Sequence, residues 1–249
     1  MPSAGLEAYR YAFAAMASRH ELQAWAPDRA QADAAARAAI ADVLRIEAKY
    51  TRYRDTSVTS AINRHAGGGE VPIDAETVAL LRYADRCHAL SEGRFDLTSG
   101  VLQQAWDFKR RPPRLPADAE IAALLERVGW PRVEWDEHSI RLPVAGMELD
   151  FGGIGKEYAA DRAAAILREC GIAHALVNLA GDVRVIGTRP DGTPWRVGIQ
   201  HPRERAGVIA TVEVVDGAVR AAGCETPGQH KLLLERLDLE EEDVAASLT

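Results

Sequence analysis

The segment Asp150-Phe-Gly-Gly-Ile-Gly-Lys-Glu-Tyr-Ala-Ala-Asp161 follows an apolar, strand-like run and leads directly into an Ala-rich, helix-like one. Its glycines predict a tight turn, in which Gly152, Gly153 and Gly155 adopt φ > 0 and bring the backbone close to a ligand. The first turn of the following helix offers unpaired N–H groups to an anion, and Lys156 adds a positive charge. The spacing differs from both the Walker and the Rossmann glycine patterns. Alone, the segment therefore predicts either a phosphate site or a strand-to-helix connection without a ligand.

Hydrophobic periodicity outward from this turn predicts an α+β fold. Helices are expected over residues 29–50, 74–92, 117–128 and 156–170. Strands are expected over residues 10–25, 132–135, 139–142, 147–151, 175–178, 182–187, 195–200 and 208–215. Because helices dominate early and consecutive strands follow late, the sheet should be largely antiparallel.

Composition is that of a globular chain able to bury a sizeable core. Its 249 residues are 47% hydrophobic and 27% charged, which suits one large domain or two closely joined lobes. A formal charge of −7 argues against general binding to nucleic acid or to an anionic membrane. There is no run of 18 apolar residues and no signal-like start, which favours the cytoplasm. Cys87, Cys170 and Cys224 lack C-x-x-C spacing, so we expect reduced thiols and no cysteine metal site.

Four flanking segments carry a family resemblance together with the glycine turn. They are Tyr53-Arg-Asp-Thr-Ser-Val-Thr-Ser-Ala-Ile-Asn63, Gly93-Arg-Phe-Asp-Leu-Thr-Ser-Gly100 with Trp106-Asp-Phe108, Leu176-Val-Asn-Leu-Ala-Gly-Asp182, and Pro194-Trp-Arg-Val-Gly-Ile-Gln-His-Pro202. In order and spacing they resemble the FAD:protein FMN transferases, the ApbE family, over about residues 13–223. The resemblance implies a T-fold-like α+β domain over 1–249, with α/β lobes at about 1–130 and 131–223 and an atypical tail at 224–249.

The same resemblance implies a reaction and a set of contacts. In this family the FMN part of FAD moves to a Ser or Thr hydroxyl of an acceptor protein, with Mg²⁺ required and AMP released. By matched position, the implied flavin contacts are Met16, Tyr53, Arg94, Phe95, Asp96, Asp150 and Lys156. The implied metal contact is Gly153, which can ligate only through its carbonyl oxygen. No catalytic side chain is assigned.

Simpler structural roles compete with several of these assignments. Met16 and Tyr53 are common in protein cores, Asp96 with Thr98 after it could cap a turn, and Asn63 could end a helix. Asp150 is the strongest candidate for a functional role, because a carboxylate at the end of an apolar run is costly without partners.

The sequence departs from the family pattern in two places. Glu157 stands where relatives usually have glycine, and after Gly223 the expected metal-binding motifs are absent. Asp243 and Ser247 partly match the missing metal-binding turn, although an ordinary C-terminal helix is the simpler interpretation. Three functions therefore stay open: an FMN transferase, a flavin-binding or scaffold protein with weak catalysis, and a hydrolase of the FAD pyrophosphate.

Overall fold

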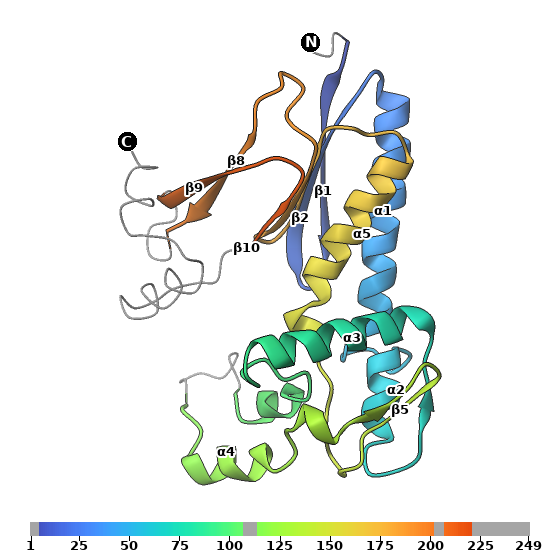
Figure 1. Cartoon of the computed structure of the whole chain (residues 1–249), viewed down its shortest axis with the longest axis vertical. Helices are drawn as coiled ribbons and strands as arrows, with labels where there is room; N and C mark the ends of the chain where they lie inside the picture. The colour runs from blue at the N-terminus through green and yellow to red at the C-terminus, as the bar shows by residue number, and fades with distance from the viewer. Residues whose placement is uncertain (1–4, 107–113, 202–206, 221–249) are drawn as a thin grey trace. The chain divides into compact units, whose positions relative to one another are not determined.

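The computed structural model describes residues 5–106, 114–201 and 207–220, and the chain divides into two compact units (Figure 1). Unit 1 contains the chain up to Leu44 and again from Lys156 onward, whereas unit 2 runs from Arg45 to Gly155. The chain passes between the units inside helix α1 (Arg29–Tyr50) and at the start of helix α5 (Gly155–Glu169). Unit 2 is therefore an insertion into unit 1, whereas the lobes expected from the resemblance follow one another along the chain.

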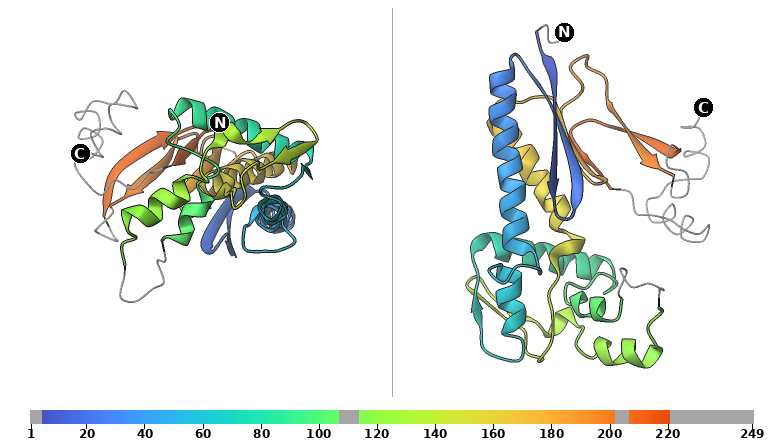
Figure 2. Two further views of the ribbon diagram at one scale, coloured as in Figure 1. Left: turned by 90° about the horizontal axis from the view of Figure 1, so that it is seen from below. Right: turned by 180° about the vertical axis from the view of Figure 1, so that it is seen from behind.

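Unit 1 is built on a five-stranded antiparallel sheet. Its strands are β1 (Glu7–Ala15), β2 (Ser18–Ala26), β6 (Ala175–Leu179), β7 (Asp182–Ile186) and β10 (Ala218–Arg220), in the order β1-β2-β6-β7-β10. A separate antiparallel hairpin consists of β8 (Trp195–Gln200) and β9 (Val208–Val214). Helix α5 and the unit 1 part of α1 run along one side of the five-stranded sheet, and the hairpin lies on the other side (Figures 1 and 2).

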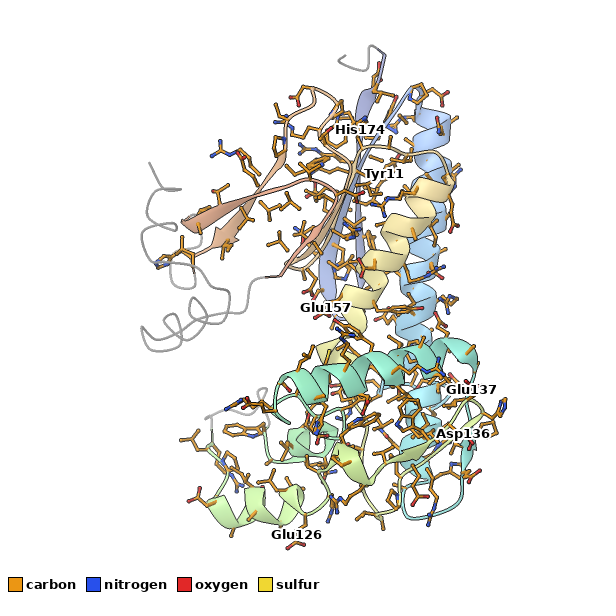
Figure 3. The ribbon with its side chains drawn as sticks, viewed as in Figure 1. Tyr11, Glu126, Asp136, Glu137, Glu157 and His174 are labelled. Carbon is orange, nitrogen blue, oxygen red and sulfur yellow. The ribbon has the colours of Figure 1, made fainter. Side chains whose placement is uncertain are left out.

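The two helices of unit 1 bury mostly alanine. The buried alanines of α1 and α5 are at most 3% exposed, and they are Ala32, Ala35, Ala36, Ala39, Ala159, Ala160, Ala163 and Ala164. Such short side chains let a helix pack close to its neighbours. Tyr11, labelled in Figure 3, ties β1 to α1 by donating a hydrogen bond to Asp33 Oδ1 at 2.7 Å. Partial burial and this hydrogen bond raise the pKa of Tyr11 to about 12.

The hairpin packs on the sheet through an apolar cluster. Val183 and Val185 of β7 contact Trp195 of β8, and Trp25 of β2 packs against the same cluster. The two tryptophan rings meet edge to face with centroids 5.2 Å apart. The Trp195 Nε1–H donates to the Gly187 carbonyl at 2.8 Å, so the polar end of this buried ring is satisfied.

Unit 2 combines short helices with a small sheet. Its helices are α2 (Val58–Arg64), α3 (Ala75–Leu90) and α4 (Asp118–Leu125), with 3₁₀ turns η1 (Gly100–Gln104), η2 (Trp130–Arg132) and η3 (Phe151–Gly153). Strands β3 (Val71–Pro72), β4 (Glu134–Trp135) and β5 (Ser139–Arg141) pair in the order β3-β5-β4. Its core includes Ile62, Leu81, Leu97, Ile140, Met147, Leu149 and Phe151, each at most 2% exposed.

Helix α3 begins at a well-defined cap. The Asp74 side chain accepts hydrogen bonds from the Thr77 backbone N–H at 3.0 Å and from the Thr77 hydroxyl at 2.7 Å. Lys49 forms ion pairs with both Asp74 and Glu76. Burial raises the pKa of Asp74, but the hydrogen bonds from Lys49 and Thr77 outweigh it and lower the pKa overall.

The predicted fold class is confirmed, since helices combine with antiparallel sheets throughout the described residues. The long helix over 29–50 and the four late strands are observed within one residue of their predicted bounds. The single strand predicted over 10–25 is wrong, because Met16 and Ala17 form a tight turn between β1 and β2. The strand predicted over 147–151 is also wrong, because this segment forms only an isolated bridge from Glu148 to Ser99.

The part of the chain that the structure describes contains no helix long and apolar enough to cross a membrane.

Candidate functional site

The segment that leads into the glycine turn is fixed by a side chain from helix α2. Asn63 Nδ2 donates to the Leu149 carbonyl at 3.0 Å, and the Leu149 N–H donates to Asn63 Oδ1 at 2.8 Å. The Asp150 N–H in turn donates to the Leu97 carbonyl at 2.9 Å. These bonds satisfy backbone groups that would otherwise belong to a sheet, which is why an extended segment exists here without a strand. Asn63 therefore anchors the turn as well as standing near the end of its helix.

The glycine turn itself is a 3₁₀ turn rather than a left-handed one. Gly152, Gly153 and Gly155 are absent from the residues with positive φ, so the predicted φ > 0 at these positions is wrong. Steric crowding explains why two of these positions are glycine. A Cβ on Gly152 would lie 2.9 Å from Asp150 Oδ1, and a Cβ on Gly153 would lie 3.0 Å from the Phe95 ring. The glycines therefore leave room for the Asp150 side chain and for the Phe95 ring, which packs against Gly153.

Asp150 caps this turn and joins a polar network. Its Oδ1 accepts from the Gly152 N–H at 2.8 Å, while its Oδ2 accepts from Gln103 Nε2 at 2.7 Å. Arg52 lies between Asp150 and Glu148, with Nη1 at 3.5 Å from Asp150 Oδ2 and Nη2 bonded to Glu148. Gln104 Nε2 donates to Glu148 Oε1 at 2.7 Å. We call the four residues Arg52, Gln103, Glu148 and Asp150 the Asp150 cluster.

A glycine lets the Asp150 cluster close up. A Cβ on Gly100 would meet Arg52 Nη1, Asp150 Cβ and the Glu148 carbonyl oxygen, each at 3.0 Å. Arg52 Nη1 also donates to the Gly100 carbonyl at 2.7 Å. Only glycine fits this crowded position without displacing a neighbour.

The charges of the Asp150 cluster favour a ligand that donates hydrogen bonds. One guanidinium faces two carboxylates, and the side chains of Arg52, Glu148 and Asp150 are only 15%, 21% and 20% exposed. The cluster therefore keeps an excess of negative charge in a partly dehydrated position. Sugar hydroxyls or ring N–H groups suit it better than a bare phosphate.

Tyr53 extends the cluster to the surface. The ring is 80% exposed, and its hydroxyl donates to Gln103 Oε1 at 3.0 Å. The core role weighed for Tyr53 is therefore wrong. An exposed aromatic ring linked through Gln103 to a carboxylate is an arrangement that a flat heterocycle with a polar edge can use.

The three residues of the Arg94–Asp96 segment have different partners. Asp96 accepts from the Thr98 backbone N–H at 2.8 Å, from the Thr98 hydroxyl, and from the Trp130 N–H at 2.9 Å. This is the capping role weighed for it from the sequence. Arg94 is exposed and pairs with Glu92 at 2.9 Å. Among the three, Phe95 is the residue whose contact with Gly153 brings it to the glycine turn.

The two remaining predicted contacts, Met16 and Lys156, belong to unit 1. Met16 and Ala17 form the β1–β2 turn with φ of 46° and 56°, a left-handed pair without glycine. Such backbone strain is a feature of functional sites as well as of hairpin turns. Lys156 lies in the first turn of α5, near enough to Asp182 to affect it. Burial raises the pKa of Asp182 overall, although the charges of Lys156 and His20 lower it.

The described residues do not supply a complete metal site. Within them, no group of three or more His, Cys, Asp or Glu side chains could hold an ion. The Gly153 carbonyl alone is too little for Mg²⁺, which prefers six oxygen ligands and usually at least one carboxylate. Asp243 and Ser247 lie outside the described residues.

Sequence analysis assigned no role to Arg52, Gln103 or Gly100, although Gly100 was quoted and the other two lie next to or between quoted segments. Arg52 directly precedes Tyr53, and Gly100 ends a quoted motif, so both had a positional signal. Gln103 had none, because an exposed glutamine in a short turn has no distinctive pattern.

Fold and site together define a two-unit α+β protein with a polar, aromatic-edged turn, and comparison with known proteins gives its family. The family model described as "ApbE family" matches residues 16–226, so the chain belongs to the ApbE family. The FAD:protein FMN transferase of Vibrio cholerae serotype O1 is 28% identical over 174 residues, covering 69% of this chain and 52% of that protein. A Klebsiella pneumoniae protein of the same name is 32% identical over 162 residues, covering 64% of this chain and 49% of that protein.

Solved structures give the same family. The ApbE protein of Thermotoga maritima has a TM-score of 0.75 and 29% identity, with 85% of this chain and 69% of that chain covered. The flavinyl transferase ApbE of Pseudomonas stutzeri has a TM-score of 0.73 and 25% identity, with 87% and 69% covered. The chain spans about half the length of the curated relatives it matches.

Proposed function

We propose that this protein binds FAD and transfers its FMN part to a serine or threonine hydroxyl of an acceptor protein. Family membership and relatives named FAD:protein FMN transferase support the reaction class. The observation that carries the proposal for this chain is that Asp150, at the glycine turn, is linked through Gln103 to the exposed Tyr53.

The transfer is a displacement at phosphorus. The acceptor oxygen forms a bond to the phosphorus of the FMN phosphate, the pyrophosphate P–O bond breaks, and AMP leaves with the bonding electrons. The hydroxyl proton is released as the new phosphoester forms. The protein's task is to align the two oxygens and to stabilise the spreading negative charge.

We propose distinct tasks for the predicted contacts. Tyr53 and Phe95 would contact the flat faces of the dinucleotide, while Asp150 would accept hydrogen bonds from its sugar or ring donors. Lys156, at the start of α5, would face the phosphates, because a helix N-terminus and a cation both favour anions. Met16, Arg94 and Asp96 stay predicted contacts.

Mg²⁺ stays part of the proposal as an ion that accompanies FAD. Because the described residues lack a ligand set of their own, Mg²⁺ would bind weakly to the protein alone.

One assay separates the candidate functions. Protein is mixed with FAD, Mg²⁺ and a peptide that carries an acceptor threonine, and the products are resolved by mass. Flavinylated peptide with AMP indicates a transferase, FMN with AMP indicates a hydrolase, and unchanged FAD with measurable binding indicates a binder. Absence of both turnover and FAD binding would contradict the proposal.

A matched pair of variants ties the assay to the site. Asp150→Asn should lower FAD affinity about tenfold, since it removes the charge that strengthens the hydrogen bonds to a ligand. Asp136→Asn is the control, because Asp136 also accepts a backbone N–H two residues ahead, at 2.7 Å, in the surface turn between β4 and β5 (Figure 3). Equal losses in both variants would place the ligand elsewhere.

A further inference from the structure

The Gln103 side chain forms hydrogen bonds with both Tyr53 and Asp150. Its Nε2 donates to Asp150 Oδ2 at 2.7 Å, and its Oε1 accepts from the Tyr53 hydroxyl at 3.0 Å. Gln103 lies at the surface in η1, so burial does not explain these two bonds. They hold together two groups that are far apart in the sequence.

The chemistry of the two partners requires an amide at this position. The ionised Asp150 carboxylate only accepts hydrogen bonds, so it must face the amide N–H group. The amide oxygen is then left for a donor, and the Tyr53 hydroxyl is that donor. A glutamate would lose the donor to Asp150, a lysine would lose the acceptor for Tyr53, and an apolar side chain would lose both.

Tyr53 needs such a restraint more than Asp150 does. Asp150 is also held by the Gly152 N–H at 2.8 Å, whereas the Tyr53 ring is 80% exposed. An exposed ring samples several rotamers, and fixing it before the ligand arrives removes part of the entropy cost of binding.

We propose that Gln103 is a positioning residue, which sets the Tyr53 ring at a fixed place relative to the Asp150 carboxylate before a flavin nucleotide binds. This inference rests on the proposed function, because it assumes that Tyr53 and Asp150 contact FAD. Gln103 itself acts through these two residues.

The neighbouring Gln104 provides the matched control. It is also an exposed glutamine of η1, and it also donates to a carboxylate at 2.7 Å, namely Glu148. Loss of Gln104 should thus disturb the fold about as much as loss of Gln103, without releasing Tyr53.

Calorimetric titration of the full 249-residue chain with FAD tests the proposal. Gln103→Ala should weaken FAD binding about tenfold with unchanged stoichiometry, whereas Gln104→Ala should change it less than about twofold. Tyr53→Phe should weaken binding about threefold in the wild-type background and have no further effect in Gln103→Ala, because the restraint is already lost. A purely structural role would instead lower the stoichiometry and leave the dissociation constant unchanged.

The titration distinguishes failure of this inference from failure of the proposed function. If the wild type binds FAD but Gln103→Ala keeps its affinity, or if the effects of Gln103→Ala and Tyr53→Phe simply multiply, the positioning role is overturned and flavin binding stands. If the wild type does not bind FAD, both are overturned.

Discussion

Two carboxylates of unit 2, Asp96 and Asp150, were both implied as flavin contacts but have different surroundings. Asp96 uses both oxygens on nearby backbone and on Thr98, and its side chain is 12% exposed. Asp150 uses one oxygen on the Gly152 N–H and the other on Gln103 and Arg52, and its side chain is 20% exposed. Asp96 is held by two backbone N–H groups and a short hydroxyl, while Asp150 is held by one backbone N–H and by two long side chains.

We interpret this difference in partners as a difference in role. The donors to Asp96 are the Thr98 N–H and hydroxyl in its own turn and the N–H of the buried Trp130 in η2. The donors to Asp150 include two long, adaptable side chains, Gln103 and Arg52, which can rearrange when a ligand arrives. We therefore expect Asp96 to matter most for stability and Asp150 most for binding.

The largest expected effect is the loss of folding stability when the Asp96 side chain is removed. Asp96→Ala should lower the free energy of unfolding by about 3 kcal/mol, because it leaves buried donors of Thr98 and Trp130 without an acceptor. Urea denaturation measures the change. Asp136→Ala, which removes similar bonds in an exposed turn, should cost only about 0.5–1 kcal/mol. A stable Asp96→Ala protein that fails to bind FAD would reverse the roles of the two carboxylates.

Local sequence signals predicted the long helix and the late strands well, but not the segment before Asp150, where the predicted strand over 147–151 is absent. Helix α1 and the strands after Gly171 follow from apolar periodicity and from turn residues, which act over a few positions. The β1–β2 turn was missed because Met16 and Ala17 carry no turn signal, and the pairing of Phe13 with His20 enforces it through the sheet. Long-range pairing therefore overrode local preference there.

The candidate site was predictable only in part for the same reason. Asp150 stood out because a carboxylate in an apolar run needs partners, but the partners themselves come from residues about 50 to 100 positions away, Gln103 and Arg52. The glycine turn was identified for the wrong physical reason. Its glycines provide room for Phe95 and for Asp150 rather than a positive φ, and such room depends on side chains that local patterns do not place.

The second prediction concerns Gly100, whose Cβ position is crowded by residues of the Asp150 cluster. Gly100→Ala should cost about 1–2 kcal/mol of stability, since its Cβ would press on the Glu148 carbonyl and on Asp150. Displacement of Asp150 should also weaken FAD binding about tenfold. Denaturation and titration report the two effects separately. Gly69→Ala is the control, because nothing lies within 4 Å of its Cβ position.

The third prediction concerns Asp74, a carboxylate that caps helix α3, and the pH dependence of its contribution to stability. Hydrogen bonds from Lys49 and Thr77 outweigh burial and lower the pKa of Asp74, so its contribution is present above the unfolded-state pKa and is lost as pH falls through the lower folded-state value. Asp74→Asn keeps a good helix cap but removes the charge. Because the side chain is 58% exposed, the loss should be only about 0.5 kcal/mol at pH 7 and should shrink as pH falls through the folded-state pKa. A loss that stays constant with pH would contradict this ion-pair explanation.

The smallest expected effect belongs to Arg94, which lies two residues before Asp96. Its side chain is 62% exposed and pairs with Glu92, which is 79% exposed. Arg94→Ala should therefore change stability by less than about 0.5 kcal/mol and FAD affinity by less than about twofold. The same titration used for Asp150→Asn measures it. A loss of tenfold or more would mean that Arg94 leaves Glu92 to contact the dinucleotide, and that the Arg94–Asp96 segment, rather than the Asp150 cluster, carries the larger share of binding.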